Sequence, residues 1–232
     1  MVKTEAKPKV IAVLSGGAGA GKSVIVASLA ASLSARKPNL RTAIIELDTS
    51  LRCLDVILGT QIGESLELHA LTDKSELSGL CAKKLTEDDE AHNAYDYVVI
   101  DTASSGKFSQ LGDVLDVAES ADALILVTTP DDDSVRQCAA LSDLLYVRGH
   151  GAKQRLVINK ADTKAEPPPD LDAVTDAVGI PLLGVLPTDS SLKLCTDKGI
   201  ELPAGSLVAN ELKAIAARLH GEYVPLIISQ KK

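Results

Sequence analysis

The stretch Ser15–Ser23, SGGAGAGKS, decides the fold of this chain. It fits the pattern G-x-x-x-x-G-K-[ST], beginning at Gly16 and closing with Gly21, Lys22 and Ser23. In such a loop, small residues let backbone N–H groups close around phosphates, and the N-terminus of the following helix favours negative charge. Lys22 is expected to reach the terminal phosphates, and the Ser23 hydroxyl is expected to help hold Mg²⁺. The alternative is a glycine-rich turn that binds nothing.

The residues on either side of the loop favour the phosphate-binding interpretation. Lys9–Leu14 is an unbroken apolar run, typical of a buried parallel strand. Ser23–Ala35 has the periodicity of a helix with one apolar face, and Pro38 stops it. Strand, loop and helix together predict a nucleotide-binding protein. The loop residues expected to contact the nucleotide are Gly16, Gly17, Ala18, Gly19, Ala20, Gly21, Lys22, Ser23 and Val24.

Strand and helix patterns alternate along the rest of the chain. Further strands are expected at Thr42–Leu47, Tyr97–Asp101, Ala121–Thr129, Arg155–Asn159 and Leu182–Pro187. Helices are expected at Phe108–Glu119, Asp131–Val147 and Leu207–Leu219. This alternation predicts an α/β, doubly wound, mainly parallel sheet of about six or more strands flanked by helices, the class of the P-loop NTPases. We expect a single domain over residues 1–232, with 1–8 and 221–232 as flexible tails.

Composition narrows the class of function. The chain has 232 residues, a net charge of −8 and only 2% aromatic residues, so its core must consist of aliphatic side chains. The acidic balance argues against broad nucleic-acid binding, which depends on clustered Lys and Arg. The four cysteines are far apart and are expected to be reduced core thiols. The N-terminus has no apolar segment typical of a secretory signal, so we expect a soluble, cytoplasmic protein.

With these pieces in order, the sequence resembles the MinD/ParA family of deviant-Walker P-loop ATPases, and the MinD branch most closely. Besides the P-loop, four segments carry the resemblance, and they occur in the family's order. They are LDTSLRCLD (47–55), VVIDTASSG (98–106), ADALILVTTPDDDSVRQC (121–138) and IPLLGVLPTDSSLKLCTDKG (180–199).

The resemblance implies Mg²⁺ and ATP as cofactors and a role for several residues. Asp48 would position the attacking water in phosphoryl transfer, and Asp101 would bind Mg²⁺ through water. Gly106 would let a switch segment respond to the γ-phosphate. Asn159, together with Lys160, and Pro187 would frame the adenine. The implied function is a slow ATPase switch that positions a cellular machine, in processes such as cell division, through unidentified protein partners, with recruitment to the membrane or cell pole by a partner.

The sequence departs from the family pattern in several places. The resemblance implies a nucleotide-dependent homodimer, in which the family's signature lysine reaches the partner's nucleotide. Gly17 replaces that lysine here, which weakens the expectation of a dimer. Glu46 stands where Asp is usual. The segment between Gly59 and Tyr95 is too short to show the extra strand expected before Tyr97. The C-terminal tail lacks the amphipathic membrane helix of MinD proteins, so direct membrane binding is not expected.

Three alternatives stay open at this stage. One is a scaffold of the same fold that binds nucleotide and hydrolyses little or none. Another is a GTPase, because Asn159–Asp162 reads NKAD and matches the N-K-x-D guanine motif. A third is a small-molecule synthetase of the kind represented by dethiobiotin synthetases, which share the general fold.

Overall fold

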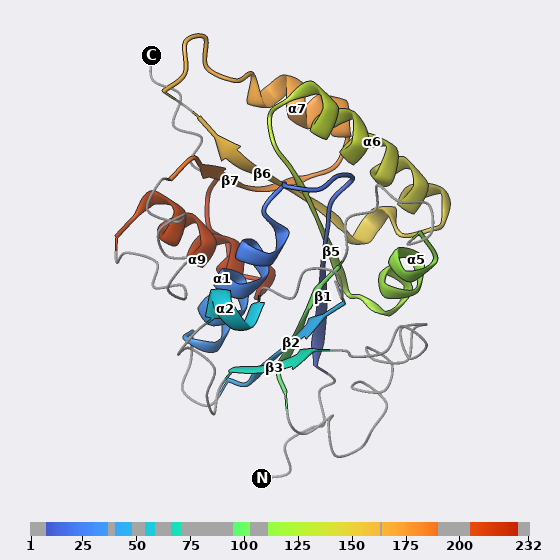
Figure 1. The fold of residues 1–232 in the computed structure, drawn as a ribbon, viewed down its shortest axis with the longest axis vertical. Helices are drawn as coiled ribbons and strands as arrows, with labels where there is room; N and C mark the ends of the chain where they lie inside the picture. The colour runs from blue at the N-terminus through green and yellow to red at the C-terminus, as the bar shows by residue number, and fades with distance from the viewer. Residues whose placement is uncertain are drawn as a thin grey trace.

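The computed structural model describes residues 8–36, 40–47, 54–58, 66–70, 95–102, 111–162, 164–189 and 205–226 (Figure 1). Its strands are β1 (Lys9–Leu14), β2 (Thr42–Glu46), β3 (Leu66–Ala70), β4 (Tyr97–Asp101), β5 (Ala123–Thr128), β6 (Gln154–Ala161) and β7 (Leu182–Pro187). Its α-helices are α1 (Lys22–Ser34), α2 (Leu54–Leu58), α5 (Leu111–Ser120), α6 (Asp132–Val147), α7 (Leu171–Val178) and α9 (Leu207–Leu219), and η4 (Gly151–Lys153) is a short 3₁₀ turn.

The described strands form one seven-stranded sheet in the order β3-β2-β4-β1-β5-β6-β7, and every neighbouring pair is parallel. This confirms the predicted doubly wound α/β class. Strand β1 lies in the middle, where Val13 is level with Asp101 of β4 and Leu14 is level with Leu126 of β5. The loop after β1 therefore leaves the centre of the carboxyl edge, where open α/β sheets bind their ligands.

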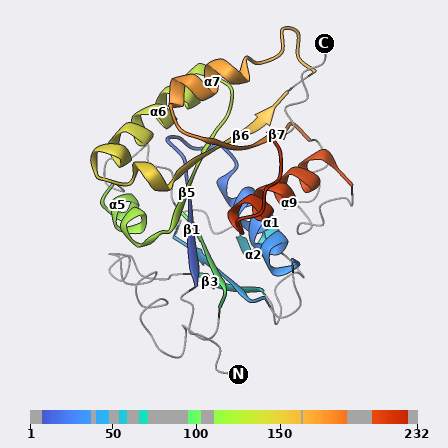
Figure 2. The same ribbon diagram turned by 180° about the vertical axis from the view of Figure 1, so that it is seen from behind.

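Helices cover both faces of the sheet, as the two opposite views show (Figures 1 and 2). Helices α1, α2 and α9 lie on one face, and α5, α6 and α7 lie on the other. The side chains of β1 alternate accordingly. Ile11 and Val13 join the first core, whereas Val10, Ala12 and Leu14 join the second. A strand buried on both faces needs the continuous apolar run from which β1 was predicted.

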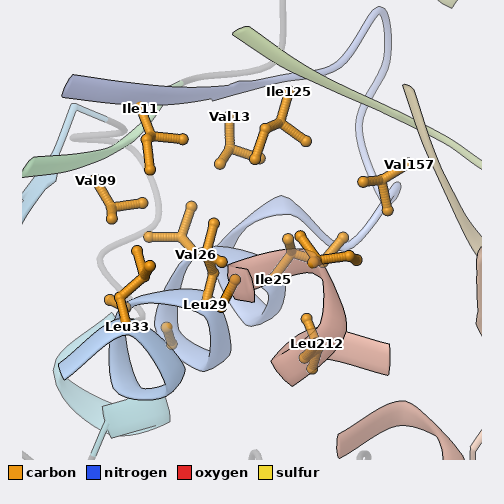
Figure 3. Packing of buried hydrophobic residues seen from close by; sticks show 14 of the residues in the cluster. Ile11, Val13, Ile25, Val26, Leu29, Leu33, Val99, Ile125, Val157 and Leu212 are labelled. Carbon is orange, nitrogen blue, oxygen red and sulfur yellow. The ribbon is translucent and has the colours of Figure 1, made fainter. Parts of the chain in front are cut away.

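Helix α1 follows the P-loop and is largely buried on the first face. Figure 3 shows Ile25, Val26, Leu29 and Leu33 of this helix pointing toward strand residues and toward Leu212 of α9. Ala27 and Ser28 are buried as well, because α2 and α9 pack beside the helix while the sheet lies against it. The predicted apolar face of α1 is therefore correct, but the helix is buried over a wider part of its circumference than that face.

The expected absence of a strand between Gly59 and Tyr95 is wrong. Strand β3 lies in that segment and pairs in parallel with β2, so that Thr42 is level with Leu66 and Glu46 with Ala70. It was missed because it is a five-residue edge strand, LELHA, whose polar residues interrupt the apolar pattern. Edge strands are only half covered and so tolerate such residues.

Near the candidate site the structure also differs from the prediction at helix α7 and at the end of strand β6. Helix α7 follows the proline-containing stretch 167–169 and was not predicted. Asp170 caps its first turn by accepting from the Ala173 amide, and Leu171, Val174 and Val178 are buried. Strand β6 continues two residues beyond the predicted end at Asn159, so Lys160 and Ala161 belong to the strand rather than to the loop beyond it. No helix in the described ranges is both long and apolar enough to cross a membrane.

Candidate functional site

The P-loop joins the carboxyl end of β1 to the N-terminus of α1, as the sequence predicted. Gly21 makes the turn into the helix with a left-handed φ of 90°, a conformation that L side chains rarely adopt. Ser15 and Gly16 are buried, whereas Ala18 and Gly19 are exposed at the tip of the loop.

Lys22 lies folded into the loop at the start of α1. It is only 7% exposed, and its Nζ donates to Ser15 Oγ at 3.0 Å. The Ser15 hydroxyl in turn donates to the Gly17 carbonyl at 2.6 Å. A buried ammonium group is costly without acceptor partners, and the Ser15 hydroxyl supplies one to Lys22.

Helix α6 packs directly against the start of the loop. A Cβ atom placed on Gly16 would lie 2.3 Å from the backbone carbon of Gln137, so this position admits only glycine without movement of the helix. A Cβ atom on Gly17 would lie 2.1 Å from Gln137 Oε1, the end of a flexible side chain. Gln137 therefore occupies the space next to the position where the family's signature lysine would begin.

The end of β6 is attached to the other side of the loop. Asn159, only 9% exposed, donates from Nδ2 to the Ala20 carbonyl at 2.8 Å, and Lys160 donates from Nζ to the Gly19 carbonyl at 2.7 Å. Lys160 is the one non-glycine residue with a positive φ, 55°, in the described part of the chain. These contacts bring Asn159 and Lys160 to the P-loop.

Two oxygen-bearing residues of the predicted magnesium site lie on neighbouring elements. Ser23 is the second residue of α1 and is half-buried, and Asp101 is fully buried at the end of β4. The adjacent Thr102 hydroxyl donates to Val13 O at 2.8 Å, which fixes the end of β4 to β1 just before the P-loop. Hydroxyl and carboxylate oxygens are ligands of the kind that Mg²⁺ prefers, so the two residues fit that ion.

Glu46 is buried at the end of β2, where the sequence differs from the family's usual Asp. Its Oε1 accepts at 3.2 Å from the backbone amide of Leu54, which is the first residue of α2. The carboxylate therefore links β2 to α2. Asp48, the predicted water-positioning residue, and Gly106 lie outside the described residues.

The turn between β5 and α6 is held by Asp131, the N-cap of α6. Its carboxylate accepts from the Thr129 hydroxyl and from the Ser134 amide. These hydrogen bonds, that of Thr129 first, hold the pKa of Asp131 below its usual range. The first-turn residues Asp132 and Asp133 add negative charge that complements the helix dipole.

An open cleft of about 600 Å³ begins at the tip of the P-loop. It extends between the β5–α6 turn and the segment after β6. Its lining consists of Ala18, Gly19, Thr129, Pro130, Asp131, Ser134, Lys160, Asp162, Ala165, Pro167 and Pro169. Its size suits a small-molecule or nucleotide ligand.

Pro187, the remaining predicted base-contacting residue, ends β7 level with Ala161 of β6. It therefore lies close in register to Asn159 and Lys160. Sequence reasoning missed Ser15 and Gln137. Ser15 could have been found, because it directly precedes the first glycine of the loop. Gln137 carries no local signal, since its contact with the loop exists only in the folded chain.

Comparison with known proteins shows the family to which this sequence is related. Residues 11–202 match the family model described as "CobQ/CobB/MinD/ParA nucleotide binding domain". The septum site-determining protein MinD of Synechocystis sp. is 26% identical, with 94% of this chain and 92% of that protein covered.

Solved structures of MinD proteins share the fold of this chain. MinD in the MinC:MinD cell division complex of Aquifex aeolicus superimposes with a TM-score of 0.77 at 21% identity, covering 94% of this chain and 98% of that one. MinD from Pyrococcus horikoshii, solved with Mg-ADP, has a TM-score of 0.73 at 18% identity, covering 91% and 96% respectively.

Proposed function

This chain belongs to the CobQ/CobB/MinD/ParA nucleotide-binding family of P-loop ATPases, and from that membership we propose that it is a MinD/ParA-like switch that binds Mg-ATP and hydrolyses it slowly. The observation that carries the proposal is the buried Lys22 at the N-terminus of α1, inside a loop held from both sides by α6 and β6. Mg-ADP in the Pyrococcus relative supports the choice of cofactor.

Lys22 would bind the terminal phosphates of ATP. In the structure its Nζ lies on Ser15 Oγ, so nucleotide binding would replace a neutral hydroxyl with a phosphate oxygen. Charge-assisted hydrogen bonds are roughly twice as strong as neutral ones, which favours that exchange. The backbone amides of 16–24 would contribute the rest of the anion site.

Ser23 and Asp101 would hold Mg²⁺, which neutralises charge on the β- and γ-phosphates when bound. Mg²⁺ keeps several waters and needs only one or two protein oxygens in nucleotide sites. One hydroxyl from α1 and one buried carboxylate from β4 meet that requirement.

Slow turnover follows from the residue at position 17. Cations supplied to a transferring phosphoryl group in trans can raise turnover by about 10³–10⁵. Gly17 cannot provide one, and its neighbour Gln137 is uncharged. Asp48 would position the attacking water. Because no cation at position 17 would stabilise the transferring phosphoryl group, hydrolysis would stay slow.

The output would be a nucleotide-dependent surface for a protein partner. The relative from Synechocystis is named for septum-site determination, and that from Aquifex was solved with MinC, so we propose a role in spatial positioning at cell division. We further propose that the protein is cytoplasmic and reaches a membrane or pole through its partner.

Calorimetric titration with Mg-ATP tests the proposal. Lys22→Ala should lose triphosphate binding, whereas Lys213→Ala, which removes an exposed lysine on α9, should bind as the wild type does. Equal ATP affinity in the Lys22→Ala variant would refute the P-loop assignment.

Asp48→Ala should bind ATP but turn it over more slowly, and an unchanged rate would remove Asp48 from the mechanism.

A further inference from the structure

The end of β6 forms the side of the nucleotide site at which a base can be read. Asn159 fixes this strand end to Ala20 of the loop, and a Cβ atom on Gly21 would lie 2.4 Å from Asn159 Nδ2. No side chain fits between them. The residues that follow Asn159 are therefore held at a fixed position relative to the phosphate site.

Lys160 adopts a backbone conformation that is unfavourable for a residue with a Cβ atom, with φ at 55°. In that conformation its Nζ reaches the Gly19 carbonyl at the tip of the loop. The ammonium group is thereby used in a contact with the protein, and the methylene stem lies at the edge of the cleft that begins there. A long apolar stem of this kind can pack against the flat face of a base.

Asp162 lines the same cleft, two residues after Lys160. One of its oxygens, Oδ1, accepts from the Lys164 amide at 3.0 Å, which orients the carboxylate. A carboxylate has about four acceptor positions, so a single amide leaves capacity for a ligand. Pro130, Pro167 and Pro169 give the cleft rigid apolar walls. The other carboxylate in its lining, that of Asp131, already accepts from the Thr129 hydroxyl and the Ser134 amide.

The hydrogen-bond donors on the edge of each base decide whether the Asp162 carboxylate would favour guanine or adenine. Guanine presents N1–H and the N2 amino group side by side, and both can donate to the two oxygens of one carboxylate. Adenine presents the N1 lone pair at the corresponding place, and a carboxylate has no proton to offer it. A site that hydrogen-bonds its ligand discriminates against an analogue that leaves the polar groups of the site unpaired, most strongly where those groups become buried by the ligand.

We propose that the nucleotide site also accepts guanine nucleotides, with Asp162 reading the guanine edge and Lys160 supporting the base. This inference rests on the proposed function, because it requires phosphates bound at Lys22. It extends the ligand class of the site from ATP to GTP through residues that lie outside the P-loop.

The test is calorimetry of the full chain with Mg²⁺ and ATP, GTP or XTP, comparing wild type, Asp162→Asn and Asp176→Asn. The wild type should bind GTP. Asp162→Asn should lower the ratio of GTP to ATP affinity at least about tenfold, since two charge-assisted hydrogen bonds become one acceptor and one mismatched donor. Asp176→Asn, which removes an exposed carboxylate on α7 outside the cleft, should keep the wild-type ratio.

XTP gives a readout that misfolding cannot imitate. Xanthine keeps N1–H and has a carbonyl oxygen in place of the N2 amino group, so an asparagine amide matches its edge as a carboxylate matches guanine. Asp162→Asn should therefore gain XTP affinity while losing GTP affinity.

The other outcomes would overturn the guanine inference, the role of Asp162 or the proposed function, as follows. ATP binding without GTP binding would refute the guanine inference and leave the proposed function intact. GTP binding that Asp162→Asn leaves unchanged, or that falls equally with ATP and without a gain for XTP, would remove Asp162 as the base-reading residue. Failure of both ATP and GTP to bind the wild type would overturn the proposed function and this inference together.

Discussion

The P-loop and the edge strand β3 are both held in place by contacts from distant parts of the chain, but the contacts differ in kind. At the P-loop the backbone of α6 and the amide of Asn159 approach Gly16 and Gly21 so closely that no side chain fits. At β3, Glu67 accepts from Tyr95 Oη and forms an ion pair with Arg41. Gly16 and Gly21 therefore tolerate no larger residue without a shift of their neighbours, whereas β3 depends on a few polar side chains that remain partly exposed.

This difference predicts where substitutions will have large effects. Overpacking a dense region displaces backbone, which typically costs about 1–3 kcal/mol. Removing a partly exposed polar contact costs less, because water replaces part of the lost interaction. The predictions below run from the dense region to the exposed one.

Gly16→Ala should have the largest effect. Its methyl group would lie 2.3 Å from a backbone carbon and 2.4 Å from the carbonyl oxygen of Gln137, so α6 or the loop must shift. We expect a loss of about 1–3 kcal/mol in the free energy of unfolding, measured in urea, together with weaker ATP binding. Gly112→Ala on α5 meets nothing within 4 Å and is the matched control, with stability equal to or above that of the wild type. A Gly16→Ala variant as stable as this control would show that the contact with α6 is loose in solution.

Asn159→Ala should come next. It leaves the Ala20 carbonyl without the Asn159 donor and opens space beside Gly21. Loss of one partner of a buried hydrogen bond costs about 1–3 kcal/mol. ATP affinity should also fall, since the loop loses its attachment to β6. The control is Asn210→Ala, an exposed asparagine whose hydrogen bond to Gly205 O is 3.5 Å long, and equal losses in the two variants would contradict the argument.

The same difference explains how far the sequence alone could be read. The P-loop, its strand and its helix were predicted because their signals are local: an apolar run, small residues at fixed spacing and a helical period. The roles of Gln137 and Glu46 were not predicted, because each depends on an element brought near only by folding. Strand β3 was missed because polar residues interrupt its short apolar pattern, and the partners of one of them, Arg41 and Tyr95 of Glu67, are 26 and 28 residues away from it.

Position 17 offers a sharper test of the contact with α6. Gly17→Lys would place its Cβ atom on the present position of Gln137 Oε1, and that flexible amide must move. Adding Gln137→Ala should relieve the conflict, so a double-mutant cycle should give a coupling of about 0.5–1 kcal/mol in the free energy of unfolding. Light scattering with Mg-ATP should then detect dimers of the double variant if the missing lysine is what prevents them. Additive stabilities would show that the residues do not interact, and a monomeric double variant would place the divergence elsewhere.

Tyr95→Phe should have the smallest effect, and it reports on the β3 region. Burial, with the hydrogen bond to Glu67 and its negative charge, raises the pKa of Tyr95 to about 12. An unfolded tyrosine ionises near pH 10, so the unfolded chain releases its proton first and the folded state loses stability as pH rises from about 10 to 12. The variant should lose about 0.5–1 kcal/mol at pH 8 but decline less steeply above pH 10, measured by urea unfolding at both. Tyr223→Phe, at a side chain 94% exposed, should keep the wild-type alkaline slope. If Tyr95→Phe keeps it too, the phenol does not stabilise β3 through Glu67, and the edge strand depends on its pairing with β2, the burial of Leu66 and the Arg41–Glu67 ion pair.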